Sequence, residues 1–313
     1  MAQLPPDLIP RPGDRGLGTT DRALLAAHVT SSWELFAELV SRADLDAPTR
    51  ANGLTVRELV IPLGAWPDNR PLAQLLDEAR RGVVGDHDQG ALVDAVREAH
   101  RDESDEDVRD AVARQGDAMR NWLCGPDDGL AQAPVASMLG SLAVITFVHA
   151  ATYPLATTAL DIASSGVVVP DALLDNGLLG LVDTIGALAA RQGLTASIAA
   201  ISPNTAVGTA ARDGAWRTWS LDPREMTLPD DVGPAVHGSA SLLLDVTSGR
   251  ADVPNAVRRR EISVHDIAGL LALAPLVEQV PGIPGRSALV GAIRATTAVS
   301  SVLRRLPFGR RDG

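Results

Sequence analysis

The side chains that could carry out chemistry in this chain are few and scattered. All 28 basic residues are arginine, so the sequence holds no lysine for a Schiff base or a lysine-based phosphate site. The single cysteine, Cys124, precedes a Gly-Pro turn with no histidine nearby, which favours an inert thiol over a nucleophile. His149 is followed one helical turn later by Tyr153, and this spacing allows the two side chains to meet. His149 is therefore the leading candidate site residue, interpreted most simply as a buried, hydrogen-bonded histidine.

Other candidate groups have simpler explanations. Ser263, His265 and Asp266 are the residue types of a hydrolytic triad, but adjacent positions cannot assemble its geometry. Helix capping accounts for Ser263 and Asp266. His28 lies on an earlier helical stretch, where a ligand role and an ordinary hydrogen-bonded histidine both remain open. No residue is assigned a catalytic role on these grounds.

The elements that must position these side chains are helical in the first half of the chain. Thr55 and Glu58 form a T-x-x-E capping box for a short helix that ends near Leu63. A first helix is expected from Thr19 or Thr20 to about Arg42. Further helices are expected from about residue 71 with an interruption at 82–90, from a Ser104–Asp107 box to Trp122, and over 169–192, as one helix or a pair.

The pattern changes after Gly193. Residues 196–211 are rich in Ala, Ile, Val and Thr, with a proline-asparagine break at Pro203. Asp213-Gly214 is a hairpin signal, and 215–220 reads as the returning strand. A short strand at 236–238 precedes a helix capped by Ser239 and closed by Gly249. Residues 257–262 are a further strand candidate, and Ser263 with Asp266 forms another capping box. We therefore predict an α-helical bundle followed by a smaller α+β domain.

Residues 129–160 contain no charged side chain and are long enough to span a bilayer. Polar residues and Pro154 interrupt the stretch, and its flanks are acidic rather than basic. We interpret it as a buried central helix, and we expect no integral membrane segment.

The net charge of −11 argues against a nucleic-acid partner, because phosphates would be repelled. The segment 286–313 reverses this sign, with six arginines and one aspartate, a net charge of +5. A lone cysteine excludes an internal disulfide framework, which fits a cytoplasmic location. The arginine-only, alanine-rich usage is typical of a GC-rich bacterial genome.

One segment carries a family resemblance. Thr55-Val56-Arg57-Glu58-Leu59-Val60, with Leu63-Gly64, resembles the W-T-V-R-D-L-V-A-H-L-G entry to the second helix of mycothiol-dependent maleylpyruvate isomerases, which have a DinB-like bundle. Thr146-Phe147-Val148-His149 resembles a later helix of that family. Val236 to Leu244 with Gly249-Arg250 resembles the sterol-carrier-like domain that accompanies the bundle.

The resemblance implies a divalent metal, typically zinc, held by two histidines and a glutamate in the bundle. Carried over position by position, these ligands fall at Pro62, Ile145 and His149. Proline and isoleucine have no donor atom, and one imidazole cannot hold a divalent ion firmly. We expect no bound metal and no cofactor.

Two functions follow from the resemblance. The favoured hypothesis is a protein that has lost metal-dependent catalysis and binds a small apolar or acidic molecule in a pocket near Pro62, Ile145, His149 and Tyr153. The alternative is a thiol-dependent isomerase or transferase that uses mycothiol with a rebuilt, zinc-containing site or a metal-free one. Whether the chain is an enzyme stays open at this point.

The expected boundaries are an extended or disordered N-terminus over 1–18, the bundle over 19–192, the sterol-carrier-like domain over 193–285 and a basic amphipathic helix over 286–313. This last helix is expected to pack on the acidic body of the protein. Weak attachment to an anionic membrane surface is the alternative.

Overall fold

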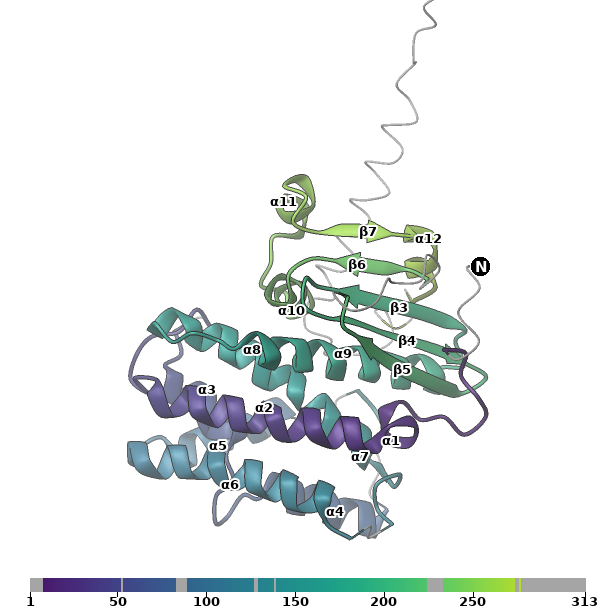
Figure 1. The fold of residues 1–313 in the computed structure, drawn as a ribbon. Coiled ribbons are helices and arrows are strands. Elements are labelled where there is room, and N and C mark those ends of the chain that lie inside the picture. The colour runs from purple at the N-terminus through teal and green to yellow at the C-terminus, as the bar shows by residue number, and fades with distance from the viewer. Residues whose placement is uncertain are drawn as a thin grey trace, which may run out of the picture.

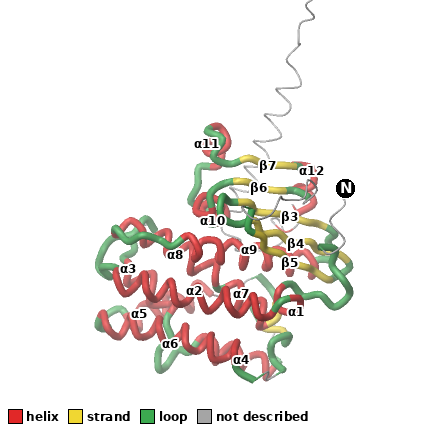
Figure 2. Tube along the Cα trace, viewed as in Figure 1, coloured by secondary structure: helices red, strands yellow, loops and turns green. Residues whose placement is uncertain are grey.

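The computed structural model describes residues 8–51, 53–82, 89–126, 129–137, 139–223, 233–273 and 276. A group of helices forms one part of the molecule, and a twisted sheet with short helices forms the other (Figures 1 and 2). The predicted succession of helices and then a mixed α and β region is confirmed. The basic segment 286–313 and the helix expected there lie outside the described residues.

The first long helix, α2 (Arg22–Arg42), follows a short helix, α1 (Leu17–Thr20). The side chain of Asp21 caps α2 by accepting a hydrogen bond from the backbone N–H of Leu24, so the expected cap at Thr19 or Thr20 is wrong. Leu25, Val29 and Phe36 recur at helical spacing and are buried, which fixes the face that α2 turns inward.

The next helices follow the capping signals closely. The capping box of Thr55 and Glu58 is present at the start of α3 (Val56–Val60), and the 3-10 helix η1 (Ile61–Leu63) continues it. The predicted interruption after residue 82 separates α4 (Pro71–Arg81) from α5 (Gln89–His100). Ser104 caps α6 (Asp105–Cys124) through the backbone N–H of Asp107.

Residues 129–160 are not one helix, which corrects the expectation of a single central helix. They form a small hairpin of β1 (Pro134–Val135) and β2 (Leu142–Ala143), then α7 (Val144–Ala150) and α8 (Thr152–Ile162), followed by η2 (Ala163–Ser165). Pro154 explains the break between α7 and α8. Proline has no N–H, so in one continuous helix the carbonyl of Ala150 would lose its hydrogen-bond partner. In the first turn of α8 the missing N–H breaks no bond, because the first N–H groups of a helix have no partner within it.

The central helix of the protein is α9 (Asp171–Arg191), within the predicted 169–192. It packs against α2, α7 and α8 on one side and against β3, β4 and β5 on the other. Among the described residues, α9 alone has the length and apolar composition to cross a membrane, and 78% of its most apolar window is buried inside the protein.

The sheet has the strand order β5-β4-β3-β6-β7, with β3 (Ala196–Ile201), β4 (Ala206–Arg212), β5 (Ala215–Leu221), β6 (Ala235–His237) and β7 (Ser263–His265). All neighbours are antiparallel except β3 and β6. Asp213 and Gly214 both have positive φ and form the predicted hairpin between β4 and β5. Ser239 caps α10 (Ala240–Thr247) as expected.

Two expectations near the end of the sheet region are wrong. The strand predicted over 257–262 is absent: its first two residues end α11 (Val253–Arg258), and 259–262 form a turn. Asp252 caps α11, and Pro254 occupies its first turn. Ser263 belongs to β7, and Asp266 by itself caps α12 (Ile267–Leu270) by accepting from the N–H of Gly269. The 3-10 helix η3 (Leu271–Leu273) follows.

The N-terminal segment and the turn after α9 connect the two parts. Arg15 forms a parallel bridge with Trp216 at the edge of β5, and α1 begins at Leu17. Gly193, with φ of 66°, lies in the turn between α9 and β3, where the helical region gives way to the sheet.

Candidate functional site

A fully buried carboxylate and imidazole lie where the helices meet the sheet. The Nδ1 atom of His149, on α7, is 2.8 Å from Oδ2 of Asp183, on α9. His149 is 0% exposed and Asp183 is 1% exposed. Burial of both groups is tolerable only because each meets a partner of complementary chemistry.

Strand β5 completes the hydrogen bonding of the carboxylate. Trp216 donates from Nε1 to Oδ1 of Asp183 at 3.0 Å, and Thr218 donates from its hydroxyl to the same oxygen at 2.6 Å. Residues 216 and 218 are two apart on a strand and therefore point to the same face of the sheet. Asp183 thus connects α9 to both α7 and β5.

Glycines make room for this arrangement. A Cβ atom on Gly16, whose φ is +59°, would lie 2.0 Å from Oδ1 of Asp183. A Cβ atom on Gly186, one turn along α9 from Asp183, would lie 2.6 Å from Cδ1 of Trp216. The close approach of the N-terminal segment, α9 and β5 therefore requires glycine at these two positions.

The environment of Asp183 favours its charged form. Burial alone would raise its pKa, but hydrogen bonds from His149, Thr218 and Trp216 and the electrostatic interaction with His149 outweigh burial and lower it. Asp183 is therefore a carboxylate at neutral pH.

A second histidine lies within electrostatic range of His149. Burial and, to a smaller extent, the interaction with His149 lower the pKa of His28 to about 4, against the opposing effect of Asp21. Nδ1 of His28 and Nε2 of His149 are both buried, and neither has a hydrogen-bond partner among the described residues. His28 is thus neutral at pH 7.

The four residues predicted to line a ligand pocket lie in different surroundings. Ile145 is buried one turn before His149 and packs so close to Gly18 that a Cβ there would lie 2.7 Å from Cγ2 of Ile145. Pro62 lies in η1, which packs against α5 and α6. Tyr153 is mostly buried, and Thr247, Arg250 and Asp245 are the groups that influence its hydroxyl, whose pKa burial raises. The structure gives His149 the partner Asp183.

The residues present do not fit the metal that the resemblance implies. Two of the three positions, Pro62 and Ile145, offer no donor atom, and the histidine at the third, His149, has one nitrogen bonded to Asp183. The described part of the chain contains no group of three His, Cys, Asp or Glu side chains placed to hold an ion. No chemical step can therefore be derived through a metal here.

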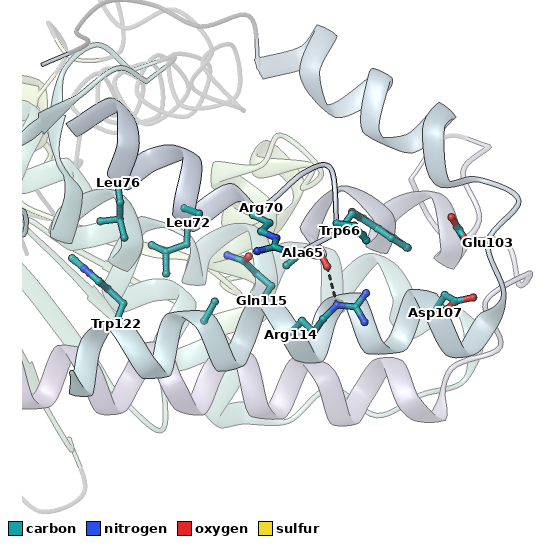
Figure 3. A pocket seen from close by; sticks show the side chains of 13 residues that line it. Ala65, Trp66, Arg70, Leu72, Leu76, Glu103, Asp107, Arg114, Gln115 and Trp122 are labelled. Atoms are coloured by element: carbon teal, nitrogen blue, oxygen red, sulfur yellow. Dashed lines mark hydrogen bonds between the residues drawn. The ribbon is translucent and has the colours of Figure 1, made fainter. Parts of the chain in front are cut away.

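A large cavity lies elsewhere, on the surface of the helical part. It has a volume of about 730 Å³ and is formed by α4, α6 and the connection around Trp66 (Figure 3). None of the four predicted pocket residues lines it, nor do His28 and Asp183. Arginines 70 and 114, Gln115 and several apolar side chains do.

Sequence reasoning missed both Asp183 and this groove. Asp183 is the one charged residue between Asp175 and Arg191, and a lone carboxylate on an apolar helix is the signal that would have identified it. The groove residues come from two separate stretches, 65–76 and 103–122, with no shared motif, so no sequence signal points to them.

No family model matches the chain, and no curated protein resembles it at a significant level. Two solved structures do resemble its fold. One is the mycothiol-dependent maleylpyruvate isomerase, with 11% identity and a TM-score of 0.49, and the other is a histidine-to-alanine mutant of that enzyme, with 12% identity and a TM-score of 0.49. Each comparison covers 81% of this chain and 96% of the other. The likeness is a distant one and concerns the arrangement of the fold alone.

Proposed function

We propose that this protein is a metal-independent binding protein for a small organic molecule, and that the pair of His149 and Asp183 is structural. The observation that carries the proposal is the groove between α4 and α6. Its volume of about 730 Å³ is in the range of small-molecule sites. Apolar walls combined with a few polar groups are also typical of such sites.

The loss of metal ligands supports the non-catalytic part of the proposal. Zinc sites in proteins use three or four donor side chains, and a catalytic site keeps at least three. Only the imidazole of His149 is left at the three positions that the resemblance implies. Its bond to Asp183 resembles the support that a metal-binding histidine receives from a carboxylate. Here the same bond links α7 to α9 and, through Asp183, to β5.

The alternative, a thiol-dependent isomerase or transferase with a metal-free site, requires a base that can reach the thiol. A general base must come within hydrogen-bond distance of the proton it removes. His149 and Asp183 are fully buried, and His28 is mostly buried as well. A substrate would reach them only if the helices and the sheet separated. The accessible groove contains no histidine or cysteine.

Native mass spectrometry and elemental analysis of the same preparation test the proposal. The full chain would be purified without chelators or metal-affinity columns. We expect a retained or exchangeable small organic molecule and substoichiometric zinc. Turnover of a cis-unsaturated diacid that depends on an added low-molecular-weight thiol, and that Asp183→Asn abolishes in a folded protein, would overturn the proposal.

A further inference from the structure

The groove between α4 and α6 changes in character along its length. Leu72, Leu76 and Trp122 form an apolar end, Arg70 and Gln115 lie in the middle, and Glu103 and Asp107 lie at the opposite end (Figure 3). A ligand that matches this order has an apolar body and a polar head, and its head lies near Arg70 and Gln115.

Gln115 is the most informative residue of the groove. Its side chain lines the cavity but is only 2% exposed, and its Oε1 atom is buried with no hydrogen-bond partner among the described residues. An orphaned buried acceptor is costly, because it has lost water and gained nothing in exchange. A ligand that donates an N–H or O–H group to this oxygen would remove the cost.

The two arginines add positive charge beside this acceptor. Arg114 is held in place by its Nε atom, which donates to the carbonyl of Ala65 at 3.1 Å (Figure 3). Arg70 precedes α4, and its guanidinium extends toward Gln115 in the same view. Neither arginine forms an ion pair within the described part of the chain, so both can bind a carboxylate.

The acidic end limits which anions fit. Glu103 and Asp107 line the same groove, so a second negative group placed beyond the arginines would be repelled. A ligand that fits this groove would therefore carry a single negative charge. The wall at Trp66 is rigid, because its Nε1 donates to the carbonyl of Ile61 at 2.9 Å and its ring stacks on His100 with centroids 4.0 Å apart.

We infer that this groove binds an amphipathic monocarboxylate with a hydrogen-bond donor close to the carboxylate, of which an N-acyl amino acid is the model. The acyl chain packs against Leu72, Leu76 and Trp122. The amide N–H donates to Oε1 of Gln115, and the carboxylate accepts from Arg70 and Arg114. This inference rests on the proposed function and names its site and ligand class.

Isothermal titration of the full chain with N-hexanoylglycine tests the inference. N-hexanoylglycine methyl ester lacks the charge, and N-hexanoylsarcosine lacks the amide N–H. We expect the wild-type protein to bind N-hexanoylglycine, and each analogue to bind about tenfold more weakly or worse, as for loss of one charged or one buried hydrogen bond.

Two variants and a matched control locate the site. Arg70→Gln and Gln115→Met are expected to weaken binding of N-hexanoylglycine about tenfold or more. Arg80→Gln, an exposed change on α4 outside the groove, should leave it unchanged. Thermal unfolding of each variant checks that it is folded. Selectivity is the second readout: Gln115→Met should no longer distinguish N-hexanoylglycine from N-hexanoylsarcosine.

The outcomes separate the inference from the proposed function. Binding of N-hexanoylglycine that neither folded groove variant weakens overturns the site but leaves the binding function intact. Failure of the wild-type protein to bind it, while native mass spectrometry finds another retained molecule, overturns the ligand class alone. If the protein neither binds N-hexanoylglycine nor retains any small molecule, both the inference and the proposed function are wrong.

Discussion

Asp183 is the residue at which three buried side-chain hydrogen bonds meet. Its two oxygens accept from an imidazole, an indole and a hydroxyl that come from α7 and β5. No sequence pattern paired it with His149, because the two are 34 positions apart and no motif includes both. Tyr153 was the nearer candidate in sequence, but a helical turn brings only neighbours on the same helix face together, and α7 ends before Tyr153.

Removing this carboxylate should destabilise the protein strongly. Asp183→Ala removes the acceptor of three buried donors, of which only the Thr218 hydroxyl keeps another, the hydroxyl of Thr209. We expect the free energy of unfolding to fall by about 3–5 kcal/mol. Asp183→Asn keeps one acceptor oxygen and should cost less. Urea unfolding measures both. Glu38→Ala, which removes an exposed ion pair with Arg42, is the control and should cost less than about 0.5 kcal/mol. Equal effects of Asp183→Ala and Glu38→Ala would contradict the structural role.

The lowered pKa of His28 predicts that the protein loses stability in acid. Its pKa in the folded protein is about 4, below the ordinary value of 6.5, so the unfolded chain takes up the proton first as the pH falls. Stability is therefore lost between about pH 6.5 and pH 4. From pH 7 to pH 5 we expect His28 to contribute a loss of about 2 kcal/mol.

Comparison with His28→Gln isolates this contribution, because the other histidines titrate in both proteins. Urea unfolding at pH 7 and pH 5 should show a smaller acid loss for the variant. Asp183 has the opposite character: its lowered pKa stabilises the fold above its ordinary value near 4, and that contribution is lost only in stronger acid. An identical acid loss in wild type and His28→Gln would show that His28 is not buried as described.

At the scale of elements, local signals predicted helix starts and tight turns well. The capping box at Thr55 and the hairpin at Asp213-Gly214 depend on residues that are adjacent in sequence, and both are confirmed. The central helix was expected at 129–160 and is α9 instead. Apolar composition indicates that a segment is buried, but it does not indicate that the segment forms one continuous helix. The β1–β2 hairpin and Pro154 divide 129–160, whereas α9 is one uninterrupted helix. The groove depends on the spacing between α4 and α6, which no local pattern contains.

The packing of α9 on α7 and α8 depends on a glycine. A Cβ atom on Gly180 would lie 2.1 Å from Oγ1 of Thr152 and 2.7 Å from the backbone oxygen of His149. Backbone cannot move as cheaply as a flexible side chain, so Gly180→Ala should destabilise by about 1–2 kcal/mol although alanine is the better helix former. Thermal unfolding checks this. Gly90→Ala, at an exposed position of α5, is the control and should be neutral or slightly stabilising. A more stable Gly180→Ala would contradict the close contact.

At the scale of the whole molecule, an ion-pair network ties the helices to the sheet region. Arg50 contacts Asp161 on α8 at 2.9 Å and Asp245 on α10 at 2.5 Å. Arg250, after α10, contacts the other oxygen of Asp161 at 2.5 Å. The side chain of Asp161 is 2% exposed, so its charge depends on these two arginines.

A double-mutant cycle on Arg50 and Arg250 tests whether the network holds the two parts together. Each single alanine variant leaves Asp161 with one arginine, but the double variant leaves a buried carboxylate unpaired. We expect the double variant to lose about 1–3 kcal/mol more than the sum of the single losses. Chemical unfolding measures this coupling. Simple additivity would mean that Asp161 is solvated and the network does not operate.

The central claim is that His149 serves the fold and not a metal, and zinc titration tests it most directly. Chelator-treated wild-type protein would be dialysed against zinc, and bound zinc would be counted by elemental analysis beside His149→Ala. We expect no stoichiometric zinc in either protein, because Pro62 and Ile145 supply no donor and His149 is bonded to Asp183. One equivalent of zinc in the wild-type protein that is lost in a folded His149→Ala variant would contradict the account.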